Sequence, residues 1–180
     1  MKKMAIIGSG LSGLTLGNLL KDRFAITLFE KARSAGGRLA TRIAAPYAFD
    51  HGAQYFTART RAFHKFIEPL IKCGLIKQWT ARHARIDGNK IIECTDWAID
   101  EPRYVGVPGM NSIARHLAQH LDIKTNTRIV LLNRQKKWQL IDEHDSLYGD
   151  FDWVISTLPA PQALTLLPEN FAYRTKIKEV

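Results

Sequence analysis

Three glycines and an acid near the start of the chain have the spacing of a dinucleotide-binding site. Gly8, Gly10 and Gly13 follow a short apolar run, and Glu30 comes 22 positions after Gly8. In such a site the first glycine permits a tight turn, the second lets a diphosphate approach the backbone, and the third lets a helix lie close to a strand. The acid accepts hydrogen bonds from an adenosine ribose. The spacing therefore predicts a bound dinucleotide.

The segments around these glycines predict the strand, turn and helix that would position them. Ala5–Ile7 is apolar, as a strand buried on both faces would be, and Phe24–Phe29 predicts the strand that ends at Glu30. The predicted helix carries an apolar stripe of Leu11, Leu14, Leu19 and Leu20. Its first turn, with Leu11 and Ser12, offers N–H groups and a positive dipole end to a phosphate. A glycine-rich turn that binds no nucleotide is the weaker alternative, because the strand, the helix and the acid occur together.

A second glycine pair follows the acid, at Gly37 and the residue before it, with Arg38 next. Two glycines let more backbone approach a long cofactor, and an arginine can pair with a diphosphate. In this stretch the chain resembles the FAD-dependent amine-oxidase superfamily, whose members carry an acid, a short spacer and Gly-Gly-Arg. The resemblance implies FAD as the cofactor. Many of these proteins have an arginine where this chain has Ala32, so Lys31 or Arg33 is expected to make that contact near the adenosine.

Further motifs narrow the resemblance to the renalase-like branch of that superfamily. They are similar in order and spacing and extend over nearly the whole chain: Phe49–Phe56, Tyr104–Ile113, Lys137–Trp138 and Phe151–Pro161. The resemblance implies that Gln54 and Tyr55 lie beside the flavin ring. It also implies that the backbone of Arg128–Val130, with Ile129 at its centre, meets the adenine.

The same resemblance implies the fold class and the domain organisation. We expect an α/β protein with a Rossmann-like FAD-binding domain of the GR2 type and the beginning of an inserted substrate domain. The FAD-binding domain is expected in two parts, at 1–58 and 107–160, with the inserted segment at 59–106 and the start of a further substrate-domain part at 161–180. Side chains of the insertion expected nearer to the substrate are Trp79, Arg82, His83 and Trp97.

Local patterns predict the remaining elements. We expect helices at Thr60–Cys73, ended by Gly74, and from Pro108 to Leu121, capped by Asn111 or Ser112. We expect extended pieces over Leu39–Phe49 and Leu75–Ile92, with a hairpin turn at Asp87–Gly88. Strands are expected at Thr127–Leu132, Trp138–Ile141 and Trp153–Thr157. Turns are expected at Asp145 and Gly149–Asp150. An i, i+4 pair, His116 and His120, could bind a metal, but no acid or cysteine joins it. We therefore expect solvent-facing histidines and no metal site.

The composition limits the class of protein. At 180 residues with 46% hydrophobic content, the chain can form one domain with a core, or one domain and part of another. Its formal charge of +9 is scattered, so no nucleic acid is expected as a partner. We expect a soluble, cytoplasmic protein, because no apolar run reaches membrane-spanning length and no signal peptide is present. Cys73 and Cys94 are interpreted as packing residues in a reducing compartment.

The sequence predicts no catalytic side chain. No serine, cysteine or lysine has an evident partner base, and no carboxylate pair is placed for acid and base catalysis. A flavin accepts a hydride itself, so this absence agrees with an FAD-dependent oxidoreductase. The resemblance implies a small-molecule substrate and reoxidation of the flavin by oxygen. The substrate would be a misreduced dihydronicotinamide dinucleotide in the renalase-like branch, or an amine in the wider superfamily.

Two alternatives of other classes remain. One is a dinucleotide-binding fragment without turnover, and the other is an NAD-dependent dehydrogenase, which the Gly-Gly-Arg sequence ending at Arg38 disfavours. In the resembling family the chain continues well beyond a segment such as Leu158–Leu167. We therefore expect that the 180 residues alone bind FAD weakly and are not a competent oxidase.

Overall fold

The computed structural model of the chain describes residues 1–97 and 101–179. Contacts between residues divide the chain into two compact units, Met1–Arg38 with Ala114–Val180, and Leu39–Ile113. The predicted insertion at 59–106 includes residues 98–100, and the predicted segment 161–180 includes residue 180; these four residues lie outside the described ones. The predicted domain boundaries remain predictions.

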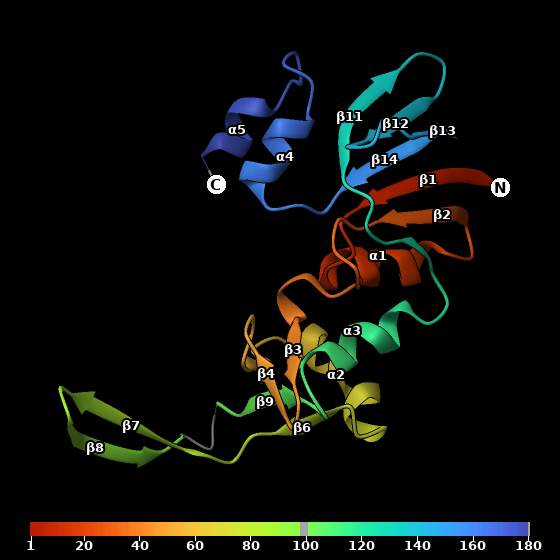
Figure 1. The fold of residues 1–180 in the computed structure, drawn as a ribbon. Coiled ribbons are helices and arrows are strands. Elements are labelled where there is room, and N and C mark those ends of the chain that lie inside the picture. The colour runs from red at the N-terminus through yellow and green to blue at the C-terminus, as the bar shows by residue number, and fades with distance from the viewer. Residues whose placement is uncertain (98–100, 180) are drawn as a thin grey trace. The chain divides into compact units, whose positions relative to one another are not determined.

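The first unit is built on a parallel sheet in the strand order β10–β2–β1–β14 (Figure 1). Its strands are β1 (Lys2–Ile7), β2 (Phe24–Phe29), β10 (Asp122–Lys124) and β14 (Trp153–Ser156). Each neighbouring pair runs parallel. Parallel strands need a crossover connection, which helix α1 (Leu11–Leu20) provides between β1 and β2. The predicted α/β class is confirmed.

A second, antiparallel sheet and several helices complete the first unit. The antiparallel sheet has the order β11–β12–β13. The bounds of these elements are β11 (Ile129–Arg134), β12 (Trp138–Asp142), β13 (Leu147–Phe151), α4 (Ala160–Leu166) and α5 (Arg174–Lys178). Helix α3 (Asn111–Ala118) contains the boundary between the two units.

The core of the first unit follows from the alternation of side chains along β2. Leu28 and Phe29 are both buried, and as neighbours in a strand they project from opposite faces of the sheet. A Cβ added at Gly17 of α1 would lie 3.4 Å from Leu28. The Phe29 ring meets Tyr148 of β13 edge-on, with 5.0 Å between the ring centroids. Helix α1 therefore covers one face of the parallel sheet, and the antiparallel sheet covers the other.

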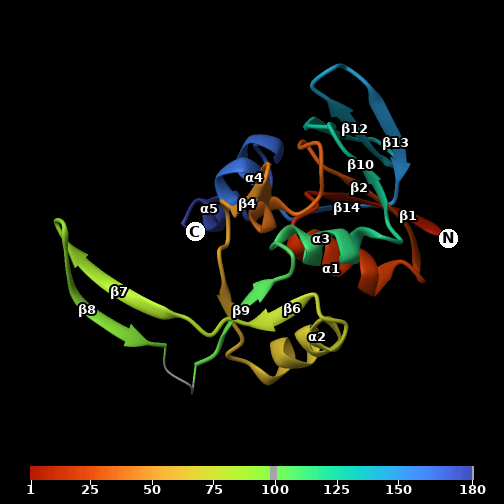
Figure 2. The same cartoon turned by 60° about the horizontal axis from the view of Figure 1, so that its bottom comes forward.

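The second unit contains helix α2 (Arg61–Lys72) and small antiparallel sheets. One sheet pairs β3 (Thr41–Ala44) with β4 (Tyr47–Asp50), a second has the order β5–β9–β6, and a third pairs β7 with β8. The bounds are β5 (Phe56–Thr57), β6 (Ile76–Gln78), β7 (Arg82–Asp87), β8 (Lys90–Asp96) and β9 (Arg103–Gly106). Figures 1 and 2 show the β7–β8 hairpin extending away from β6 and β9, and every residue of its two strands is exposed.

The helix predicted at Thr60–Cys73 is confirmed. The Oγ1 atom of Thr60 accepts a hydrogen bond from the N–H of Phe63 at 3.2 Å, so Thr60 is the N-cap of α2. Cys73 is the C-cap, and Gly74 follows it at a φ of +78°, which favours glycine. The predicted hairpin turn at Asp87–Gly88 is also confirmed, because it joins β7 to β8.

The predicted apolar stripe of α1 is wrong at Leu19, which is 72% exposed. The buried positions of α1 are Gly13, Leu14 and Gly17. Small residues let this helix approach the sheet closely, so a narrow apolar stripe is enough to pack the helix on the sheet.

The predicted turn at Gly149–Asp150 is also wrong, because both residues lie within β13. Asp150 keeps the strand going at a φ of +65°, which an aspartate tolerates, while the pairing of β12 with β13 shifts register nearby. The chain reverses instead around Asp145, where a turn was also predicted.

Helix α3 ends at Ala118, before the predicted Leu121, because the N–H groups of Gln119 and Leu121 bond three residues back in the tighter 3-10 manner. Ser112 lies inside the helix, and its buried Oγ has no hydrogen-bond partner among the described residues, so it is not a cap. His116 and His120 are both exposed, as predicted.

The interpretation of Cys73 and Cys94 as packing residues is wrong, because both are exposed. Cys73 lies at the end of α2, and Cys94 lies on the exposed β7–β8 hairpin. Among the described helices, none has the length and apolar character needed to cross a bilayer.

Candidate functional site

The turn between β1 and α1 requires glycine at two of its positions. Gly8 has a φ of +102°, and a Cβ added at Gly13 would lie 2.0 Å from the carbonyl oxygen of Gly8. That carbonyl accepts a hydrogen bond from Oγ1 of Thr157, directly after β14, at 3.0 Å. The turn is therefore fixed between the end of one strand, the start of the helix and the residue that follows a second strand.

The N-terminus of α1 is open where the turn meets it. Gly10 is the N-cap, no side chain caps the helix, and its first turn contains no acid. A Cβ added at Gly10 would meet nothing within 4 Å. The first-turn N–H groups, including those of Leu11 and Ser12, have no partner inside a helix. They and the positive end of the helix dipole can together hold an anion.

Glu30 is buried directly after β2, beside this turn. Its Oε2 accepts hydrogen bonds from the N–H of Ser9 at 3.0 Å and from the Ser9 hydroxyl at 2.8 Å. Its Oε1 accepts one from the N–H of Ala32 at 2.9 Å. The side chain is 7% exposed. These bonds hold the carboxylate in one orientation, and Oε1, which accepts only one of them, keeps acceptor capacity for a ribose hydroxyl.

The second glycine pair lies against the first turn. The N–H of Gly36 donates to the carbonyl of Ser9 at 2.9 Å, and a Cβ added at Gly37 would lie 3.3 Å from the Cα of Gly10. Gly37 also has a φ of +55°, so a side chain there would be strained. Arg38 is exposed in the short 3-10 helix Gly37–Leu39, and Lys31 is exposed as well. The two glycine motifs thus form one surface.

The segment that leads into β11 joins the same surface. The N–H of Thr127 donates to the Glu30 carbonyl at 2.8 Å, and the N–H of Asn126 donates to the Ala32 carbonyl at 3.0 Å. Ile129 begins β11 two residues later, and its side chain is buried in the core with Phe29. The structure therefore brings the start of β11 beside Glu30, while the role of Ile129 toward adenine remains a prediction.

Gln54 and Tyr55 belong to the second unit and are both exposed. Tyr55 lies in an aromatic cluster, with its ring centroid 5.3 Å from that of Trp97 and 6.1 Å from that of Trp79. Their roles beside a flavin remain predictions. His83, by contrast, points its ring at the Thr95 hydroxyl across the exposed β7–β8 hairpin.

Two hydroxyl residues that no sequence motif pointed to hold the first unit's site together. Ser9 joins the turn to Glu30 through both its N–H and its hydroxyl. Thr157 joins β14 to the turn, because its hydroxyl lies within hydrogen-bond distance of the carbonyls of Ile7 and Gly8. A hydroxyl between two motif glycines, and another directly after the last parallel strand, are the signals that could have identified them. The described residues contain no group of three His, Cys, Asp or Glu side chains that could hold a metal ion.

Residues 6–70 match a family model described as an NAD(P)-binding Rossmann-like domain. The matched range contains both glycine motifs and Glu30, which the structure has brought together. The chain therefore contains a Rossmann-like domain.

Two curated relatives extend this match. Renalase from Mus musculus is 26% identical over 180 residues, which cover 92% of this chain and 49% of renalase. The L-glutamate oxidase precursor of Streptomyces diastatochromogenes is 40% identical over 82 residues, which cover 41% of this chain and 12% of that protein. The predicted resemblance to renalase is confirmed. The chain spans about half the length of renalase.

A solved structure shares the fold. The crystal structure of a putative protoporphyrinogen oxidase from Exiguobacterium sp. 255-15 superposes with a TM-score of 0.72, at 15% sequence identity, over 99% of this chain and 63% of that chain. At this level of identity the match supports the Rossmann-like fold alone.

Proposed function

We propose that the Rossmann-like domain binds FAD and that the chain is part of an FAD-dependent oxidoreductase. The observation that carries this proposal is the open N-terminus of α1 at Gly10, bordered by Gly37 and by the fixed carboxylate of Glu30. A Cβ at Gly10 would point into open space, which is what close approach of a diphosphate requires. The residues present therefore fit the adenosine and diphosphate part of the cofactor.

Each residue of this surface has a distinct role in the proposal. Glu30 accepts hydrogen bonds from the ribose hydroxyls, and the first-turn N–H groups of α1 bind the diphosphate. Arg38 pairs with the diphosphate through its planar guanidinium, Lys31 contacts the adenosine, and the backbone at Ile129 meets the adenine. Gln54 and Tyr55 are proposed to lie beside the isoalloxazine. Bound FAD supplies hydride acceptance, which no side chain of this chain could supply.

The proposed substrate is a misreduced dihydronicotinamide dinucleotide, with oxygen as the final acceptor. The similarity to renalase along 92% of the chain supports this choice over an amine. The match to an oxidase of glutamate covers 41% of the chain and supports an amine or amino acid as the second candidate. The two are separated by mixing FAD-loaded protein with each substrate and following the loss of flavin absorbance and the formation of hydrogen peroxide.

The cofactor proposal is tested by titrating the chain with FAD and with NAD, using isothermal calorimetry and the fluorescence of the flavin. We expect Arg38→Lys to weaken FAD binding about tenfold or more, because an ammonium group cannot make the two-pronged contact of a guanidinium. Arg23→Lys, an exposed arginine directly before β2 and so at the opposite end of that strand from Glu30, is the matched control. Equal weakening by both substitutions, or binding of NAD without FAD, would contradict the proposal.

A further inference from the structure

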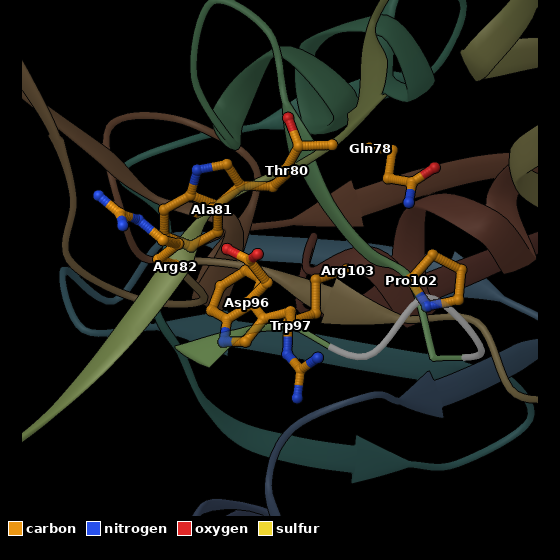
Figure 3. Close-up of a pocket in the computed structure, with 9 residues that line it drawn as sticks. Gln78, Thr80, Ala81, Arg82, Asp96, Trp97, Pro102 and Arg103 are labelled. Carbon is orange, nitrogen blue, oxygen red and sulfur yellow. The ribbon is translucent and has the colours of Figure 1, made fainter. Parts of the chain in front are cut away.

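The second unit contains a cavity that the FAD proposal does not use. It lies where the chain leaves β6, enters β7, leaves β8 and enters β9, and it has a volume of about 490 Å³ (Figure 3). A volume of this order suits a small organic ligand. The large side chains that line it are Trp79, Trp97 and Arg103, and Figure 3 shows the guanidinium of Arg103 beside the indole ring of Trp97.

Two tryptophans give the cavity an aromatic wall. The rings of Trp79 and Trp97 meet edge to face, with 4.7 Å between their centroids. The backbone holds both in place: the N–H of Trp79 donates to the carbonyl of Arg103 at 2.7 Å, and the N–H of Trp97 donates to that of Ala81 at 3.4 Å. Two perpendicular rings offer one face and one edge to a third planar ring, which is the arrangement that aromatic groups prefer.

Arg103 brings a positive charge to this wall. Its Cζ lies 4.5 Å from the centroid of Trp97, and its enclosed Nε has no hydrogen-bond partner among the described residues. The contact with the indole face stabilises the positive charge but leaves the N–H without an acceptor. The Nε–H is enclosed by protein and closed to a ligand, so an anionic group in the cavity would meet Arg103 at the outer nitrogens of its guanidinium.

Among the described residues near Arg103, no acid forms an ion pair with its guanidinium. Glu101 pairs with Arg59, at 2.6 Å between Oε1 and Nε, and gives Arg103 only a backbone carbonyl at 3.4 Å. Asp96 also lines the cavity and stands opposite Arg82 in the register of the β7–β8 hairpin. The position beside Arg103 is therefore the favoured place for an anionic group.

We propose that this cavity binds a small planar aromatic carboxylate. The ring of the ligand packs against Trp79 and Trp97, and its carboxylate pairs with the outer N–H groups of the Arg103 guanidinium in charge-assisted hydrogen bonds. The proposal concerns the second unit alone and is tested without flavin, so its outcome is independent of the FAD proposal.

The test uses benzoate and the indole N–H resonances of the chain labelled with nitrogen-15. The chain has four tryptophans: Trp79 and Trp97 line the cavity, whereas Trp138 and Trp153 lie in the first unit and serve as internal controls. Adding benzoate to about 10 mM, where a site with a millimolar Kd is largely filled, is expected to shift the resonances of Trp79 and Trp97 with saturation. Assignment follows from single Trp→Phe variants.

Matched ligands separate the two parts of the proposed contact. Benzamide keeps the ring without the charge, and cyclohexanecarboxylate keeps the charge without the planar ring; each is expected to bind about tenfold more weakly than benzoate. Inorganic phosphate is expected to leave the four resonances unchanged. Equal affinity for benzoate and benzamide would overturn the role of Arg103, and equal shifts of all four tryptophans would overturn the site.

A matched pair of variants completes the test. Arg103→Gln is expected to lower the affinity for benzoate about tenfold or more, while Arg85→Gln, on the exposed face of β7 outside the cavity, leaves it unchanged. An unchanged affinity in Arg103→Gln would contradict the proposal. Should Arg103→Gln lose its folded spectrum, the comparison of benzoate with benzamide on the unsubstituted chain decides the question.

Discussion

Gly10 and Gly13 belong to one glycine motif, but packing within the chain requires a glycine only at Gly13. At Gly13 an added Cβ would lie 2.0 Å from the Gly8 carbonyl oxygen, whereas at Gly10 it would meet nothing within 4 Å. Gly10 also has an extended backbone, with φ −70° and ψ −177°, which suits a serine at an N-cap. The first glycine of this pair is therefore free for ligand contact, and the second is fixed by the packing of the helix on the turn.

We predict that serine substitutions separate these roles. Gly13→Ser should destabilise the fold by about 1–3 kcal/mol, because the turn and the helix must move apart. Gly10→Ser should change stability by no more than a few tenths of a kcal/mol, since a serine caps a helix slightly better than glycine does. Its hydroxyl would then occupy the N–H groups proposed for the diphosphate, so FAD binding should weaken.

Thermal unfolding and calorimetric titration measure the two effects. The pair acts as its own control, because both variants add the same side chain three residues apart. A Gly10→Ser variant with full FAD affinity would show that the open N-terminus of α1 does not bind the diphosphate.

At Glu30, the sequence predicted the position of the acid but not the hydrogen bonds that orient it. Its spacing from Gly8 predicted an acid at the end of a strand, and the structure has it there. The three hydrogen bonds that orient it come from Ser9 and Ala32, and neither residue type is required by the motif. Such support depends on where backbone N–H groups point, which follows from the folded turn and not from residue spacing.

A helix or strand could be predicted from the sequence where its own residues determine it. Helix α2 has an N-cap threonine and a glycine after its C-cap, and its prediction is confirmed to within a residue at each end. Strand β10, which completes one edge of the parallel sheet beside β2, was not predicted. It has three residues, of which only Ile123 is apolar, so its strand character comes from pairing with β2 and not from its own pattern.

Next to the connection between β12 and β13 lies a buried acid, Asp142, whose surroundings shift its pKa. Asp142 is 4% exposed; its Oδ1 accepts from the N–H groups of His144 and Ser146, and its Oδ2 accepts from the Tyr148 hydroxyl. Burial raises the pKa of Asp142, but these hydrogen bonds outweigh it and hold the pKa below its ordinary value of 3.8. Burial and the hydrogen bond to Asp142 raise the pKa of Tyr148.

We predict that Asp142 contributes acid-sensitive stability to this connection. Its folded pKa lies below its unfolded value, so the unfolded chain binds the proton more readily. The contribution is therefore fully present above the unfolded pKa and is lost as the pH falls through the folded pKa. Unfolding in urea, measured from about pH 6 down to about pH 3, should show a shallower loss of stability for Asp142→Asn than for the unsubstituted chain.

Asp145→Asn is the matched control, because it removes a carboxylate from the same turn and keeps a residue type that tolerates the φ of +62° there. The lowered pKa values of Glu68 and Asp152 remain in both variants and cancel in the comparison. Equal pH profiles for Asp142→Asn and the unsubstituted chain would remove Asp142 from the acid dependence.

At the scale of the whole molecule, the described residues divide into parts with very different burial. The parallel and antiparallel sheets share a core that includes Ile7, Phe29 and Leu140. The strands of the β7–β8 hairpin are exposed throughout, and among the described residues they pair only with each other. An isolated two-stranded hairpin is marginally stable in water, so local opening should be easiest there.

We therefore predict that limited digestion with trypsin cuts the chain first within this hairpin, after Arg85 or Lys90. A protease needs a locally unfolded stretch of several residues, and the hairpin can open without disturbing either sheet of the first unit. Lys136 is the internal control: it is also exposed, in the turn between β11 and β12, but the neighbouring strand β12 is anchored in the core by Leu140. Mass spectrometry of the earliest fragments identifies the site, and a double Arg85→Gln, Lys90→Gln variant should delay the first cut. A first cut after Lys136 or Lys124 would show instead that the antiparallel sheet or β10 opens before the hairpin.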